Sequence, residues 1–317
     1  IPERVDAEKE STFAIGVDEM SWDDLNNNNY NWPTLGEVKQ YRDKVRKVVS
    51  DFIKTTPLTL PIQWDDPFWI INMGIEHERI HIETSSVLIR ELPIEKVRSV
   101  DLFSICPISN EPPVNSLVEV KGKPVTLGKT HDDEFYGWDN EYGQKQKEVK
   151  SFKASQFLVS NQEYLEFMQD GGYQNKEYWG AEGWKWNEFT EAQYPHFWVK
   201  SKDNYKYRTL TEEIDMPWDW PVDINYLEAE AFCAWKSKQT GTKIRMPTEA
   251  EWMIMRENLD TDQPLWEKAP GNINLEYWAS ACPVNYFDST GGLHDIIGNV
   301  WQWTDSPMAA LPGFKVH

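Results

Sequence analysis

The sequence predicts an α+β protein in which a helical domain comes first and a tryptophan-rich mixed domain follows. Up to about residue 110, apolar side chains recur at steps of three and four residues, the period of one face of a helix. The segment 107–124 then concentrates proline, serine and glycine. Beyond it short alternating stretches appear, with thirteen of the seventeen tryptophans. We therefore place a helical domain at residues 1–110 and a second domain at residues 111–317.

Two long amphipathic helices are predicted in the first domain. Thr34 and Glu37 have the spacing of a capping box, and an apolar stripe follows until Pro57 limits the helix. The second helix starts with Asp66 as cap and Pro67 in the first turn, and its stripe continues to Leu88. Because two such helices cannot bury their stripes alone, we expect a helical bundle with a partner helix upstream of residue 1.

The second domain is predicted to mix short strands with three helices. Alternation favours strands at residues 150–154 and 156–159. Helices are expected at 161–168 and 225–238, and the capping-box spacing of Thr248 and Glu251 predicts a third.

Composition excludes several classes of partner. The chain carries 32 basic and 52 acidic residues, a formal charge of −20, which opposes binding to nucleic acid or to an anionic membrane. Its three cysteines (Cys106, Cys233 and Cys282) are odd in number, and neither a signal peptide nor an apolar stretch of membrane-spanning length is present in the sequence. A cytoplasmic location is expected.

The sharpest chemical signal is the pair His77 and His81 inside the second predicted helix. Residues four apart share one helix face, so both imidazoles can bind one metal ion. Flanking glutamates, Glu76, Glu78 and Glu83, could orient the rings or simply form a solvated face. A packed or solvated histidine pair is the competing interpretation.

The same residues also fit H-E-x-x-H, the zinc protease signature, with Glu78 as general base. That activity needs a third metal ligand downstream, and none is obvious on the same or the next helix. Arg79 lies within the motif. The zinc protease therefore stays an alternative.

Several stretches resemble 5-histidylcysteine sulfoxide synthases, the family that begins ovothiol biosynthesis and is related to the ergothioneine sulfoxide synthases. The first-domain stretches are FAIGVDEMSWDDL from Phe13 to Leu25 and IEHERIHIETSSVLIRELP from Ile75 to Pro93. The later part resembles formylglycine-generating enzymes, a variant of the C-type lectin fold, in residues 139–141, 157–161, 224–235, 245–252 and 298–303.

The resemblance implies a DinB-like helical domain that binds iron(II), followed by a formylglycine-generating-enzyme-like domain. Such enzymes join the sulfur of cysteine to the imidazole of histidine with dioxygen and form a sulfoxide. Three histidines hold the iron, and two of them correspond to His77 and His81. A few imidazoles leave open coordination positions, as oxygen-activating iron sites require. A C-terminal methyltransferase domain is expected in the full-length protein.

Two departures from the family pattern are expected to matter. The third histidine ligand lies upstream of residue 1, so the sequence looks like a fragment that lacks both ends and is inactive alone. His131, His196, His294 and His317 are expected in surface or packing roles. Ala309 occupies the position of a family tyrosine, which leaves the proton donor unknown.

Other residues are assigned substrate or cation roles by the same resemblance. Asp139, Asn140 and Glu141 are candidates for binding a substrate amine, although a turn-stabilising cluster is the simpler interpretation. Trp301 and Trp303 are candidates for the cleft wall. A Ca²⁺ site is expected near Asn299. A histidine-betaine substrate, as in the ergothioneine branch, and a non-catalytic lectin-like binding module remain alternatives.

Overall fold

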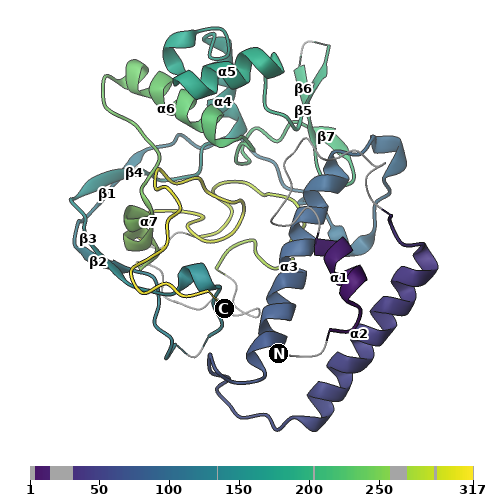
Figure 1. Cartoon of the computed structure of the whole chain (residues 1–317). Coiled ribbons are helices and arrows are strands. Elements are labelled where there is room, and N and C mark those ends of the chain that lie inside the picture. The colour runs from purple at the N-terminus through teal and green to yellow at the C-terminus, as the bar shows by residue number, and fades with distance from the viewer. Residues whose placement is uncertain are drawn as a thin grey trace. The chain divides into compact units, whose positions relative to one another are not determined.

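The computed structural model describes residues 4–14, 31–133, 135–202, 204–257, 270–288 and 291–316 (Figure 1). The chain forms two compact units, Ile1–Ile71 and Asn72–His317. The boundary between these two units falls inside one helix. The boundary near Asn110 separates the two domains expected from the sequence, and it stays a prediction. Among the described residues, no helix is both long enough and apolar enough to cross a membrane.

The first unit contains α1 (Ala7–Ala14), α2 (Leu35–Thr55) and the start of α3 (Trp69–Arg90). The capping box of α2 is confirmed, because Thr34 N donates to the Glu37 carboxylate at 2.8 Å and Glu37 N donates to Thr34 Oγ1 at 3.4 Å. Before α3, the Asp66 carboxylate accepts from Phe68 N at 2.8 Å. α2 thus begins where the local sequence predicts, whereas α3 begins at Trp69, two residues after the predicted first helical position Pro67.

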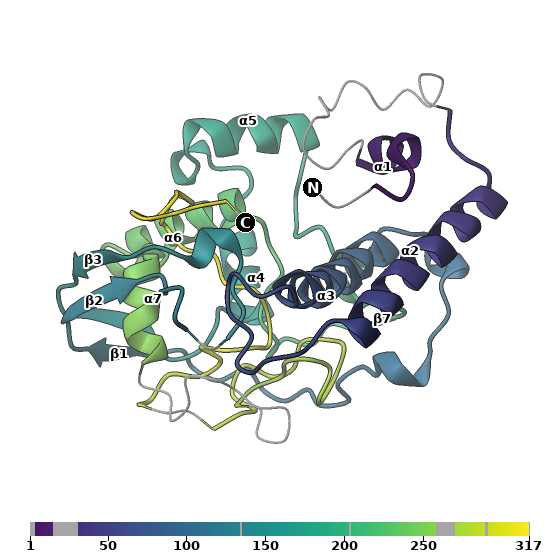
Figure 2. The ribbon, with the colours of Figure 1, turned by 60° about the horizontal axis from the view of Figure 1, so that its bottom comes forward.

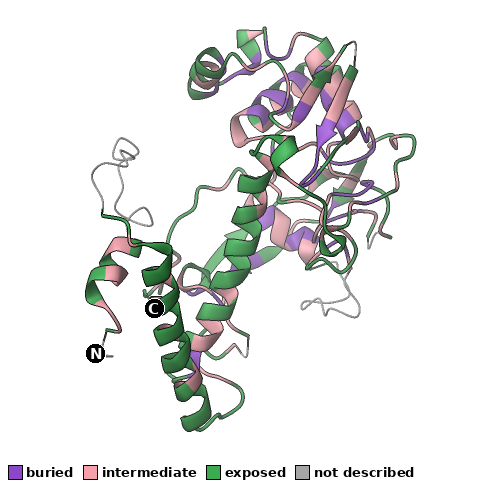
Figure 3. Ribbon diagram, turned by 90° about the vertical axis from the view of Figure 1, so that its right-hand side faces the viewer, coloured by how far each residue is buried: buried purple, intermediate pink, exposed green. Residues whose placement is uncertain are grey.

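The apolar stripe of α2 contains no buried residue, as the green ribbon in Figure 3 shows. Only Phe68 and Trp69 are buried in this unit, among its described residues. The Phe52 and Phe68 ring centroids lie 5.5 Å apart. The predicted helical bundle is therefore not formed by the described residues and stays a prediction.

The second unit mixes helices with small antiparallel sheets. Its strands are β1 (Leu117–Val120), β2 (Pro124–Leu127), β3 (Lys145–Glu148), β4 (Phe152–Ser155), β5 (Trp198–Ser201), β6 (Asn204–Arg208) and β7 (Glu213–Asp215). β1 pairs with β4, β2 pairs with β3, and β5, β6 and β7 form a meander. Its helices after α3 are α4 (Asn161–Gln169), α5 (Ala181–Thr190), α6 (Tyr226–Thr240) and α7 (Glu249–Arg256). Short 3₁₀ turns occupy Ile94–Lys96, Asp101–Phe103, Asp139–Glu141 and Lys176–Tyr178.

The three helices predicted in this region are confirmed as α4, α6 and α7, each with a capping box. The predicted strand at 150–154 is β4, displaced by one to two residues. The strand predicted at 156–159 is wrong. Gln156 N donates to Ser116 O at 2.8 Å, and Val159 O accepts from Val222 N at 2.9 Å, so the backbone bonds of this stretch go to different segments and no ladder forms.

Three clusters of buried side chains hold the second unit together. α7 packs over β1 and β2 through Val120, Val125, Leu127, Ala250, Ile254 and Met255, and Figure 2 shows α7 across the β2–β3 pair. α4 and α6 share an aromatic cluster of Tyr164, Phe167, Tyr173, Tyr178, Trp179, Phe232 and Trp235. The meander contributes Trp198 and Tyr207 to a third cluster with Cys106, Met216, Trp220 and Cys282.

One carboxylate lies inside the aromatic cluster. Glu228 is only 3% exposed, and Tyr173 OH donates to its Oε1 at 2.5 Å. Tyr164 OH lies 3.1 Å from Tyr173 OH, and Asn225 N donates to the other Glu228 oxygen at 2.9 Å. Burial raises the pKa of Glu228, while the hydrogen bonds from Tyr173 and from the Asn225 backbone oppose that rise.

Tyr173→Phe is expected to lower the free energy of unfolding by about 1–3 kcal/mol, because it removes a bond to a buried acceptor. The phenol stabilises the carboxylate more than the protonated acid, so the loss should grow as the pH rises through the pKa of Glu228. Urea denaturation of the full chain at acidic and neutral pH measures it. The exposed Tyr286→Phe is the control and should change stability by less than about 0.5 kcal/mol. A pH-independent loss in Tyr173→Phe would contradict the account.

Candidate metal centre and its surroundings

His77 and His81 lie together on α3, as their spacing predicts. Their ring centroids are 4.5 Å apart, and the ring planes meet at 86°. Both side chains are exposed. One helical turn separates the two α-carbons, so the rings project from one face and are free to turn toward a common ion.

A cleft of about 330 Å³ opens beside His81. Five further α3 residues, Glu78, Ile82, Ser85, Ser86 and Ile89, line one wall. Phe103 and Leu210 line the opposite side. The cleft therefore combines one imidazole, one carboxylate and two hydroxyls with apolar walls, which is the usual make-up of a small-molecule site.

The described part of the chain contains no group of three histidine, cysteine or carboxylate side chains placed to hold a metal. Glu76 is engaged in an ion pair with Arg79 at 2.9 Å. His77 and His81 thus fit as two ligands of a larger set. The third ligand required by a zinc protease is likewise absent among the described residues.

The other histidines make contacts elsewhere. His131 stacks on Tyr142 with ring centroids 4.6 Å apart. His196 Nε2 lies 2.8 Å from the Glu91 carboxylate, and His294 Nδ1 lies 2.8 Å from Phe287 O. His317 lies outside the described residues.

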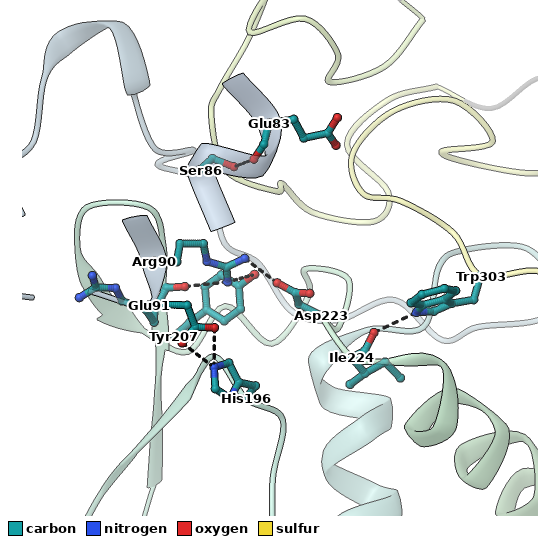
Figure 4. Close-up of polar contacts among 10 residues, drawn as sticks. Glu83, Ser86, Arg90, Glu91, His196, Tyr207, Asp223, Ile224 and Trp303 are labelled. Carbon is teal, nitrogen blue, oxygen red and sulfur yellow. Dashed lines mark hydrogen bonds and ion pairs between the residues drawn. The ribbon is translucent and has the colours of Figure 1, made fainter. Parts of the chain in front are cut away.

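The structure places Trp301 on the other side of α3 from His81. Trp301 Nε1 donates to Glu83, which follows His81 by two residues and so projects about 200° away from it around the helix. Trp303 Nε1 donates to Ile224 O at 3.0 Å (Figure 4). The Trp303 ring also meets Tyr226 edge-on. Trp301 therefore contacts the helix that carries the histidines on the side away from His81, whereas Trp303 contacts the segment before α6.

Asp139, Asn140 and Glu141 form a 3₁₀ turn. The Glu141 carboxylate accepts from Trp138 N at 2.7 Å, so this side chain stabilises its own turn. Burial raises the pKa of Tyr136 to about 12, and Tyr142 contributes to the rise. Glu141 of this turn and Glu76 of α3, the residue before His77, raise the same pKa further, a relation that the sequence does not reveal. A substrate role for the turn stays a prediction.

Asn299 belongs to a tight turn whose backbone is left-handed at Gly298 and Asn299, with φ of 87° and 63°. Its side chain is fully engaged: Oδ1 accepts from Cys282 N at 2.9 Å, and Nδ2 donates to Cys282 O and to Asp295. Asp295 is 7% exposed, and its Oδ1 has no hydrogen-bond partner among the described residues. Burial raises the pKa of Asp295 to about 7, although the bond from Asn299 opposes this. Any cation at this turn would thus meet the Asp295 oxygen rather than the Asn299 side chain.

Ala309 is exposed in the segment after Trp303. A methyl group cannot transfer a proton, so Ala309 cannot serve as an acid or a base. Glu78 is the carboxylate residue that lines the same cleft as His81.

Proteins with named functions are similar to most of the chain. Hercynine oxygenase of Mycolicibacterium smegmatis is 28% identical over 308 residues, which cover 90% of this chain and 66% of that protein. Hercynine oxygenase of Mycolicibacterium thermoresistibile is 30% identical over 211 residues, covering 60% of this chain and 44% of that protein. The inactive Cα-formylglycine-generating enzyme 2 of Bos taurus is 26% identical over 232 residues, covering 62% and 72%. The chain thus spans 66% and 44% of the two oxygenases.

A family model supplies the classification. The model described as the sulfatase-modifying factor enzyme 1-like domain matches residues 106–313, which include all seven strands and helices α4 to α7. This match takes in more than half of the chain, so the chain belongs to the sulfatase-modifying factor enzyme 1-like family.

Proposed function

We propose that the full-length protein is a non-haem iron(II) enzyme that uses dioxygen to form a carbon–sulfur bond. Its substrates are cysteine and histidine, and its products are 5-histidylcysteine sulfoxide and one water. The observation that carries the proposal is the exposed pair His77 and His81, of which His81 lines a cleft of amino-acid size. Similarity to hercynine oxygenases over most of the chain supports oxygenase chemistry.

The proposal includes the arrangement of the domains. A DinB-like bundle would occupy residues 1–110, and the residues from 111 onward would form the family domain. A third histidine would complete the ligand set from a segment of the bundle outside this sequence. A methyltransferase domain in the full-length protein is part of the same proposal.

The residues present fit iron(II) as part of a ligand set. Two imidazoles are neutral nitrogen donors that suit iron, and their exposure leaves room for substrate ligands beside them. When bound, the iron would supply a centre at which thiolate, imidazole and dioxygen come together.

The cleft residues have separate tasks in this proposal. Glu78 would accept the proton that the thiol or the imidazole ring loses, because its carboxylate lies on the same cleft wall as His81. Ser85 offers a hydroxyl group to the polar ends of an amino acid, whereas Ser86 Oγ donates to Glu83 O at 2.6 Å and offers only an acceptor. Ile82, Ile89, Phe103 and Leu210 would exclude water and so hold the substrates in a fixed orientation.

A second candidate substrate is hercynine, the betaine of histidine, with the ergothioneine branch as its setting. The 28% identity to a hercynine oxygenase over 90% of this chain favours it. Incubation of the iron-loaded full-length protein with cysteine and equal amounts of histidine and hercynine separates the two. Product from histidine supports the first proposal, whereas product from hercynine alone supports the second.

His77→Ala and His81→Ala should each lower iron(II) affinity by more than the roughly 10- to 100-fold that loss of an outer-shell partner costs, because each removes a direct ligand. Iron content after dialysis and oxygen uptake with both amino acids measure the effect in the full-length protein. His131→Ala is the matched control, since His131 stacks on Tyr142 far along the sequence from the pair. Normal iron content in both α3 variants would exclude this helix as the iron site.

Glu78→Gln separates the oxygenase from the zinc protease. As a proton acceptor in the oxygenase, Glu78 should contribute roughly 10²- to 10⁴-fold to kcat, and iron should stay bound in the variant. Oxygen uptake and casein hydrolysis are measured on the same preparations. Peptide hydrolysis by the parent protein that disappears in Glu78→Gln, without oxygen uptake, would support the protease instead.

We also propose a calcium ion at the Asp295 turn near Asn299. The buried carboxylate oxygen without a partner fits a cation, since a bound ion would neutralise a charge that burial otherwise disfavours.

Millimolar CaCl₂ should raise the Tm of the full chain, and Asp295→Asn should reduce that shift by removing the charged ligand. At 100 times the Kd, binding contributes about 2.7 kcal/mol to stability. Differential scanning calorimetry with CaCl₂, MgCl₂ and EDTA measures the shift. Asp305→Asn, which changes an exposed carboxylate, is the control. An equal Tm shift in Asp295→Asn would rule out this ligand.

A further inference from the structure

Helix α3 has two chemically different faces. Glu78, His81, Ile82, Ser85, Ser86 and Ile89 line the cleft. Glu76, Glu83 and Arg90 are spaced by seven residues, so they form a stripe that drifts by only about 20° per step, and Arg90 lies about 180° around the helix from His81. We call these three residues the rear stripe.

Arg90 holds the end of the rear stripe to the family domain. Its side chain is only 16% exposed, and Nη1 donates to Asp223 Oδ2 at 2.7 Å. Nη2 donates to Arg208 O at 2.9 Å and approaches the Tyr207 hydroxyl at 3.5 Å (Figure 4). The guanidinium carbon also lies 3.5 Å from the ring centroid of Phe197.

A second attachment returns to the same helix. Ile224, next to the Arg90 partner Asp223, accepts a hydrogen bond from Trp303 at 3.0 Å. Trp301, two residues earlier, donates to Glu83 of the rear stripe. Glu83 and Arg90 are therefore joined through the segments 223–224 and 301–303, which closes a ring of contacts behind the helix.

We propose that Arg90 and Asp223 are positioning residues that fix the rear of α3 to the family domain and so turn His77 and His81 toward the cleft. Arg90 lies about two and a half turns beyond His81 on an uninterrupted helix, so rotation of its end is transmitted to the histidine pair. Neither residue touches the cleft. The effect of this attachment on catalysis rests on the proposed iron function, whereas the attachment itself does not.

The geometry requires arginine at this position. A planar guanidinium can bond the Asp223 carboxylate and the Arg208 carbonyl in one plane while it stacks on Phe197. The compact ammonium of lysine cannot make this set of contacts. Arg90→Lys therefore preserves the charge and removes the attachment.

The variants are Arg90→Lys, Asp223→Asn and their combination in the full-length protein, with Asp223→Glu as the conservative variant. Lys238→Met is the matched control, because it breaks the exposed Lys238–Glu177 ion pair at 3.0 Å. Hydrogen exchange of the α3 amides, which needs no iron, is the first readout. The second comprises kcat, KM and the EPR spectrum of the iron(II)–nitric oxide adduct.

Arg90→Lys and Asp223→Asn are each expected to speed exchange in α3 at least roughly tenfold and to lower kcat by roughly 10- to 100-fold with KM within about twofold. The EPR spectrum should change in both. The double variant should be no worse than the single ones, because they remove one attachment. Asp223→Glu should restore much of kcat.

Unchanged α3 exchange in Arg90→Lys, or effects that multiply in the double variant, would overturn the attachment. Faster exchange with an unchanged kcat and EPR spectrum would overturn the positioning role. A parent protein that binds no iron would instead refute the proposed function, and the exchange data would still decide the attachment.

Discussion

The arrangement of the candidate site depends on one interaction, the contact of the Arg90 guanidinium with Asp223 and the Arg208 carbonyl. A largely buried cation must be paired, and removing its partner leaves a charge whose desolvation is uncompensated. This requirement specifies which face of α3 meets the meander β5–β7. The opposite face, which carries the histidines, is then directed to the cleft.

A single helix therefore joins the histidine pair to the family domain. The cleft face of α3 supplies an imidazole, a carboxylate and two hydroxyls, while the rear stripe supplies Glu83 and Arg90. Of the two other residues that line the cleft, Leu210 belongs to the family domain and Phe103 precedes it in the sequence. The family domain thus contributes an apolar side chain to the cleft.

Local signals explain what could be predicted from sequence. The capping boxes at Thr34 and Thr248 depend on residues three apart, and the histidine pair depends on residues four apart. These local features are therefore found as expected. The strand at 156–159 failed because its backbone partners lie in distant segments. The contact of Arg90 with Asp223 could not be predicted for the same reason, because the two residues are 133 positions apart in the sequence. A role of Trp301 and Trp303 in the cleft wall stays a prediction; Trp301 contacts α3 at Glu83, on the side away from His81, and Trp303 contacts Ile224.

The most direct test is a crystal structure of the iron-loaded full-length protein with data collected at the iron absorption edge. The account predicts one anomalous peak within bonding distance of ring nitrogens of both His77 and His81, on the cleft side of α3. Arg90 should contact Asp223 on the opposite side of the same helix. An iron peak bound by other residues, or a helix turned so that the histidines face Trp301, would contradict it.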